Sequence, residues 1–165
     1  MMMIKSWLPV FGVCLAIGAS ACALIGPESS TEEFFFEAIK DRRGWNGSAN
    51  ASFRSADPGT LLIQGVRRTN EYTEDVVGIR LKFSGPGTYV VASEQGFYDT
   101  LIGGDVLDKS YRTFGSAYDQ VVITRYDSLA KVVEGEMQLR LKNMDERQGD
   151  EVLFSLGRFR AKIRN

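Results

Sequence analysis

Apolar and polar residues alternate along several segments of this chain, and this period of two constrains its fold more than any other feature. Every second residue is apolar within 136–142, 77–83 and 158–164. Such alternation places the apolar side chains on one face of a β-strand, as in antiparallel sheets with one solvated face. No comparable helical stripe occurs beyond the first 25 residues, so the pattern predicts a fold built from strands.

Further strand candidates are separated by turn-forming residues. The additional predicted strands are 34–40, 49–54, 60–67, 87–93, 111–115 and 120–126. The predicted turns are 45–47, 57–59, 84–87, 102–105 and 148–150. About nine short strands of this kind predict an all-β fold, an antiparallel sandwich or barrel of which a lipocalin-like barrel is one form.

The last strand contains a change of parity. Val152, Phe154 and Leu156 are two residues apart, whereas the apolar residues from Phe159 onward occupy the other parity. A slip of one residue would turn every later side chain to the opposite face. We therefore predict a β-bulge at Gly157, between the two sets.

The N-terminus has the three parts of a secretory signal: Lys5, an apolar run over 7–19, and small residues at 19–21. Cys22 directly follows Ala21, as in a bacterial lipobox, although Ala19 stands where Leu is usual. We predict a signal helix over 1–21 that is cleaved between Ala21 and Cys22, with acylation of Cys22. Residues 22–33 then form a lipidated, flexible tether, and residues 34–165 form one β-rich domain. Several acyl chains would anchor this domain to a bilayer, and Ala23 after the cysteine favours the outer membrane.

Composition excludes several chemistries. The chain contains no histidine and only two cysteines, Cys14 and Cys22. Catalytic triads that use histidine are therefore excluded, and zinc sites are disfavoured. The formal net charge of −1 gives no basic field for nucleic acid. We predict no cofactor, no metal and no nucleic-acid partner.

Two groups of side chains are candidates for binding. Arg158, Arg160, Lys162 and Arg164 form a basic row on one face of the last strand. This row would contact anionic lipid or acidic polysaccharide, or it would protect a sheet edge from aggregation. Trp45, Tyr72, Phe97 and Tyr98 lie in or beside predicted loops. Aromatic side chains there could stack on a sugar, cover an apolar pocket, or cap the ends of the sandwich.

Other motifs are weaker. Asp99-Thr100-Leu101 and Asp127-Ser128-Leu129 resemble an O-glycosylation sequon of Bacteroidota, with Thr100 and Ser128 as acceptors. Glu134 and Glu136 share a strand face and are the only candidates for a carboxylate-based hydrolase, but a solvated outer face is the favoured interpretation. Asp145, Glu146, Asp150 and Glu151 form an acidic predicted loop without a recognised calcium spacing. We therefore predict no catalytic residue.

The order of several short motifs resembles an uncharacterised family of β-rich lipoproteins of Bacteroidota. These motifs are Gly44-Trp45, 61–65, Gly87-Thr88-Tyr89, 121–127 leading to 133–137, and Gly157-Arg158-Phe159. Met137 stands where the family usually has an aromatic residue. The resemblance implies an envelope lipoprotein with an all-β domain, and it carries over no catalytic or binding residue.

Three functions remain open from the sequence. The first is a non-catalytic binding or accessory domain at the outer membrane, for a small apolar ligand, a glycan or an envelope protein. The second is a structural subunit of an envelope complex, and the third is a hydrolase that uses two carboxylates in one cleft.

Overall fold

The structure is a computed structural model that describes residues 33–145 and 149–164. The described part contains ten β-strands and no helix, which confirms the all-β prediction. In chain order the strands are β1 Phe35–Lys40, β2 Arg43–Phe53, β3 Thr60–Arg68, β4 Thr73–Lys82, β5 Gly87–Val90, β6 Gly96–Ile102, β7 Val106–Thr113, β8 Gln120–Asp127, β9 Val132–Asn143 and β10 Glu151–Arg164. The predicted signal and the tether up to residue 32 lie outside the described residues. Within those residues, no helix has the length and apolar character needed to span a membrane.

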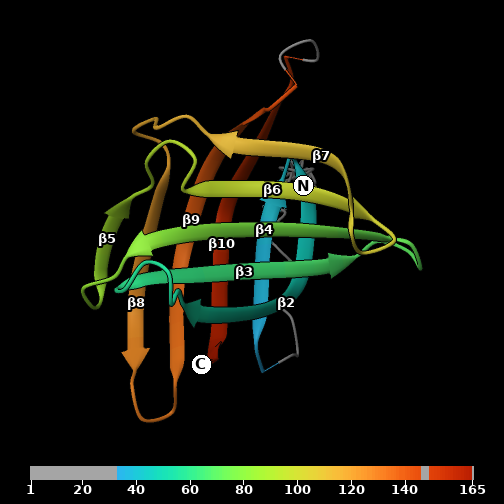
Figure 1. The fold of residues 1–165 in the computed structure, drawn as a ribbon. Helices are drawn as coiled ribbons and strands as arrows, with labels where there is room; N and C mark the ends of the chain where they lie inside the picture. The colour runs from blue at the N-terminus through green and yellow to red at the C-terminus, as the bar shows by residue number, and fades with distance from the viewer. Residues whose placement is uncertain (1–32, 146–148, 165) are drawn as a thin grey trace, which may run out of the picture.

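Seven strands close a ring in the order β2–β3–β4–β6–β7–β9–β10 and back to β2. Neighbours in the ring are antiparallel except β10 and β2, which run parallel where Lys162–Arg164 lies beside Asn50–Ser52. We call the line along which β10 meets β2 the seam. Beyond the parallel contact, β1 lies in the seam between β2 and β10 and pairs with both. In Figure 1, β3, β4, β6 and β7 cross in front of β9 and β10. The ring is therefore a flattened barrel whose two layers enclose the core.

Strand β9 changes partner along its length. It pairs with β8 through Val132–Gln138 and with β7 through Leu141–Asn143, while β5 adds to the far side of β8. Between the two pairings, the Arg140 N–H donates to Oδ1 of the buried Asp119 at 2.6 Å. A side-chain carboxylate thus takes the place of a neighbouring strand where β7 and β8 diverge.

The interior follows the predicted alternation. Val77, Ile79 and Leu81 on β4, and Met137, Leu139 and Leu141 on β9, are all buried. Three aromatic rings pack at the centre of the core. The ring of Trp45 lies edge-on to Phe36 at 5.7 Å and to Phe154 at 6.1 Å between centroids. Contacts of this kind add to the stabilisation that burial of the rings provides.

The turn predicted at 45–47 is wrong, because these residues lie inside β2 and the indole of Trp45 is buried. The chain reverses instead at Asp41 and Arg42, whose φ angles are 48° and 69°. Two positive φ angles give a mirror-image turn whose twist matches that of a tight hairpin. The turn is also tied to β10, because Asp41 Oδ1 accepts a hydrogen bond from the Leu153 N–H at 2.9 Å.

Strand β6 was not predicted, because its aromatic residues bury on both faces of the sheet. Tyr98 points inward, whereas Phe97 lies on the outer face and is only 5% exposed. The Phe97 ring covers Gly78 on β4, where an added Cβ would lie 2.2 Å from Phe97 Cζ. The guanidinium carbons of Arg80 and Arg112 lie 4.6 and 5.5 Å from the centre of the same ring.

The bulge predicted in the last strand is present, one position earlier than expected. The register of β10 against β9 shifts between Phe154 and Gly157. Leu156 has a φ of 50° and is 65% exposed, so it does not share the inner face with Val152 and Phe154 as its parity suggested. Gly157 has a different role: a Cβ there would lie 2.7 Å from Met137 Cγ, so glycine permits close approach to β9.

Candidate functional site at the mouth of the barrel

The inward-facing row of side chains becomes polar at one end of the barrel. On each of strands β1 to β4, the residue of inward parity nearest this end is charged. These residues are Lys40 on β1, Arg43 on β2, Arg67 on β3 and Asp75 on β4. All four lie close to the β1–β2 or the β3–β4 turn. The β6–β7 turn lies at the same end, because the Gly103 N–H donates to the Tyr72 carbonyl at 2.7 Å. We call this end, defined by Lys40, Arg43, Trp45, Arg67 and Asp75, the mouth.

Asp75 organises the mouth. Its Oδ2 accepts a hydrogen bond from Arg67 Nη2 at 2.6 Å, and Thr69 and Thr100 each donate to the carboxylate at 3.3 Å. Asp75 is only 5% exposed, so its charge is compensated by these donors rather than by solvent. The contacts fix the Arg67 side chain across the opening.

Aromatic rings form the floor below these charges. The guanidinium carbon of Arg67 lies 5.4 Å from the Trp45 ring centre, and Lys40 Nζ lies 4.9 Å from that of Tyr98. A pocket of about 480 Å³ opens here. It is lined by Lys40, Asp41, Arg43, Gly44, Trp45 and Arg67. Pockets that hold small molecules generally measure about 300–1,000 Å³.

Two donors in this lining have no acceptor. Trp45 Nε1 and Arg67 Nε are both buried, and neither has a hydrogen-bond partner in the described structure. Buried N–H groups are nearly always hydrogen-bonded, and leaving one unpaired costs about 1–3 kcal/mol. Both N–H groups therefore lie beneath the surface of the pocket, where the described structure gives them no acceptor.

The tyrosines near the mouth are neutral donors over the physiological pH range. Burial is the main cause that raises the pKa of Tyr98 to about 12. Burial and a hydrogen bond to Asp150 also raise the pKa of Tyr111, whose hydroxyl donates to Asp150 Oδ2 at 2.8 Å. The hydrogen bonds from Tyr111 and Asn143 in turn lower the pKa of Asp150.

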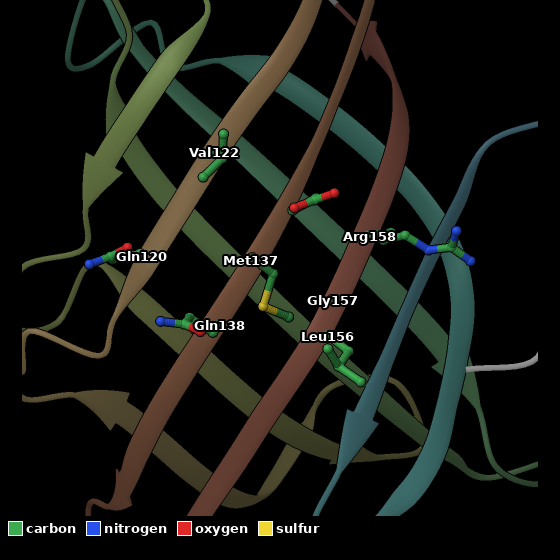
Figure 2. A pocket seen from close by; sticks show the side chains of 8 residues that line it. Gln120, Val122, Met137, Gln138, Leu156, Gly157 and Arg158 are labelled. Atoms are coloured by element: carbon green, nitrogen blue, oxygen red, sulfur yellow. The ribbon is translucent and has the colours of Figure 1, made fainter. Parts of the chain in front are cut away.

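A second hollow lies on the outer surface of β8, β9 and β10 (Figure 2). This outer groove has a volume of about 430 Å³ and lies beside the β10 bulge. It is lined by Gln120, Val122, Glu136, Met137, Gln138, Leu156, Gly157 and Arg158. The side chain of Leu156 stands at one side of it, and Gln120 and Gln138 at the other (Figure 2). The groove is thus an apolar strip with polar ends, without the buried unpaired donors of the mouth.

The predicted basic row shares the outer face of β10, but much of its charge is compensated. Arg158 Nη2 lies 2.8 Å from Oε2 of the buried Glu37, and Arg160 Nε lies 3.6 Å from Glu134 Oε1. Lys162 Nζ donates to a backbone carbonyl at 2.9 Å. The edge-protection interpretation is wrong, because β10 pairs with neighbours on both sides. Arg164 lies at the far end of the row, beside β2 and β3.

The four predicted aromatics do not form one site. Trp45 and Tyr98 both pack on Phe154 beneath the mouth, although they lie on strands rather than in loops. Phe97 is covered on the opposite face of the sheet. Tyr72 is 66% exposed in the β3–β4 turn.

The remaining sequence candidates are dispersed. Thr100 is partly buried and bonded to Asp75, whereas Ser128 is exposed in the β8–β9 turn. Glu134 is paired with Arg125 and Arg160 on the outer face, where Glu136 also lies. Among the described residues, no three histidine, cysteine, aspartate or glutamate side chains form a metal-binding group. Ala21, Cys22 and Glu146 lie outside the described residues.

Sequence reasoning missed Lys40, Arg43, Arg67 and Asp75. The signal was present in the alternation itself: Leu61, Ile63 and Gly65 face inward, and the next residue of that parity is Arg67. A charge at an inward position near the end of a strand indicates the opening of a barrel. Comparison of the chain with protein-family models, with curated proteins and with solved structures gives no match.

Proposed function

We propose that this chain is a lipid-anchored envelope protein whose β domain is a non-catalytic binding module, with the mouth as its binding end. The observation that carries the proposal is the pocket of about 480 Å³ at the mouth, whose lining includes Lys40, Arg43, Arg67 and Trp45. The secretory signal, the cysteine after it, and the resemblance to Bacteroidota lipoproteins support the envelope location.

The anchor is tested by Cys22→Ala in a bacterial host. We expect the wild-type chain in the membrane fraction and the variant in the soluble fraction, because the acyl chains supply the attachment. Mass spectrometry of the purified chain should begin at an acylated Cys22. A variant that stays membrane-bound would show that the anchor lies elsewhere.

The binding role is tested by native mass spectrometry of the chain released gently from its own membranes. A small-molecule adduct is expected on the wild type and should be lost in Arg43→Gln, which alters a lining residue of the mouth. An adduct that survives in this variant would place binding at another surface, such as the outer groove.

A second candidate, a subunit of an envelope complex, is favoured by apolar side chains beside the β6–β7 turn. Tyr72, Val106 and Leu107 are 66%, 59% and 54% exposed. The pairing of β7 with β9 covers only Tyr111–Thr113, so the earlier part of β7 has a neighbour on one side alone. Crosslinking in cells should capture a partner through this surface, and Val106→Asp should abolish the crosslink.

A further inference from the structure

We propose that the mouth binds the oxyanion, carboxylate or phosphate, of a small organic molecule. This inference rests on the proposed binding function and names the chemistry of the ligand. It is argued from the donors and charges that line the pocket.

Cations dominate the lining. Lys40, Arg43 and Arg67 contribute three positive charges, against Asp41 in the lining and Asp75 beside Arg67, which leaves one net positive charge at the mouth. Asp41 is already engaged, since its Oδ1 accepts from the Leu153 N–H at 2.9 Å and its Oδ2 lies 3.4 Å from Lys40 Nζ. A cationic ligand would therefore meet like charges, whereas an oxyanion would be attracted.

The charged groups of the lining are mainly donors. The ammonium of Lys40 and the guanidinium groups of Arg43 and Arg67 can donate hydrogen bonds but cannot accept them. Arg67 is held in place at the pocket, because its Nη2 donates to Asp75 at 2.6 Å. An oxygen acceptor that carries negative charge is the best match, since charge-assisted hydrogen bonds are about twice as strong as neutral ones.

The pocket is larger than a free inorganic anion requires. Its volume of about 480 Å³ leaves room for an organic group joined to the oxyanion. Gly44 and Trp45 supply the uncharged part of the wall. The ligand class is therefore a small organic acid or a phosphate monoester.

The experiment uses Trp45 as a reporter. The sequence contains two tryptophans, Trp7 and Trp45, and Trp7 lies in the signal whose removal we propose, so the processed chain gives a single indole N–H signal in a ¹H–¹⁵N NMR spectrum. This chain, in detergent at fixed ionic strength, is titrated separately with benzoate, phenyl phosphate, benzamide and inorganic phosphate. We expect benzoate or phenyl phosphate to shift the Trp45 signal saturably, and the neutral benzamide to bind at least tenfold more weakly. Whichever of the two aromatic anions binds tighter identifies the oxyanion.

The outcomes separate the two proposals. Equal binding of benzamide and benzoate would overturn the oxyanion inference and leave a binding pocket in place. No response to any probe would overturn the inference, while the native mass spectrum decides the binding function independently. A response to inorganic phosphate equal to that of phenyl phosphate would overturn the requirement for an organic group.

A matched pair of variants tests whether the mouth itself is responsible. Arg43→Gln removes a lining charge and should weaken binding of the preferred anion at least fivefold. Arg68→Gln removes the same charge from the outward face of β3, where the side chain is 84% exposed, and should leave affinity unchanged. Equal losses of affinity in both variants would indicate only long-range electrostatic attraction and would contradict a specific binding site at the mouth.

Discussion

Leu156 has a backbone conformation that its side-chain type disfavours. Its φ of 50° lies in the left-handed region, and its side chain is 65% exposed. For residues with a Cβ this conformation costs about 1–2 kcal/mol. The fold requires it because the bulge must absorb one residue before Gly157 packs on Met137.

We expect Leu156→Gly to stabilise the domain by about 1 kcal/mol, because glycine adopts positive φ without penalty. Urea unfolding followed by circular dichroism measures the change. Leu153→Gly is the control, since Leu153 lies in the paired part of β10 and is 37% exposed. The free energy of unfolding of that variant should fall by about 1 kcal/mol or more, because glycine weakens a regular strand. Destabilisation by both substitutions would show that Leu156 is not strained.

Tyr98 links stability to alkaline pH. Burial raises its pKa from the ordinary value of 10 to about 12, so the folded state holds the phenolic proton more tightly than the unfolded state. The resulting stability is fully present below about pH 10 and is lost as pH rises through the interval up to about 12. In Tyr98→Phe, the free energy of unfolding should fall less steeply over this interval. Urea titrations at several pH values check this, and identical slopes in both proteins would contradict it.

At the scale of elements, the branch at β9 depends on a single loop residue. Asp119 is fully buried. Its carboxylate accepts hydrogen bonds from the N–H groups of Arg140 at 2.6 Å and of Ser116 at 3.0 Å. Its backbone carbonyl accepts a hydrogen bond from the Val91 N–H. One side chain therefore joins the β7–β8 loop to β9 beside the point where β8 begins. Without the Asp119 carboxylate, the Arg140 N–H would have no acceptor at the point where the partner of β9 changes from β8 to β7.

We expect Asp119→Ala to cost about 2–4 kcal/mol, since it leaves two N–H groups without acceptors. Amide hydrogen exchange should show the largest loss of protection at Arg140. Asp119→Asn retains one acceptor oxygen and should lose less stability than Asp119→Ala. Unchanged exchange at Arg140 in the alanine variant would mean that the carboxylate does not hold the branch.

Alternation is clearest in the elements that are buried on one face only. β9 and the part of β10 after its bulge alternate cleanly because their outer faces carry Glu136, Arg158 and similar charges. β6 was missed because Phe97 and Tyr98 bury on opposite faces, which removes the alternation. Trp45 was placed in a turn because Asn-Gly follows it, although a buried indole outweighs a local turn preference. The alternation marks single charged inward positions such as Arg67, but it does not show which strands meet, so the grouping of such positions at one end of the barrel could not be predicted.

At the scale of the whole molecule, the ring closes through the last strand of the chain. β10 pairs with β9 along most of its length and reaches β2 only at Lys162–Arg164. The contacts of β10 with β1 and β2 join residues more than a hundred positions apart, so loop-closure entropy opposes them. The mouth depends on the same closure, because β1 and β2 supply Lys40, Arg43 and Trp45.

Deletion of residues 162–165 should therefore open the seam. The deletion removes the parallel pairing with β2 and the buried side chain of Ile163, which is 6% exposed. It also removes the hydrogen bond that the Ile163 N–H donates to the Lys131 carbonyl. Loss of a buried isoleucine alone costs about 2–5 kcal/mol. We therefore expect urea unfolding to show a free energy of unfolding that is lower by at least about 3 kcal/mol. Deletion of Asn165 alone is the control, because it leaves the Lys162–Arg164 pairing with β2 in place. If the longer deletion unfolds at the wild-type midpoint, β1 alone closes the barrel and the parallel seam contributes little to its stability.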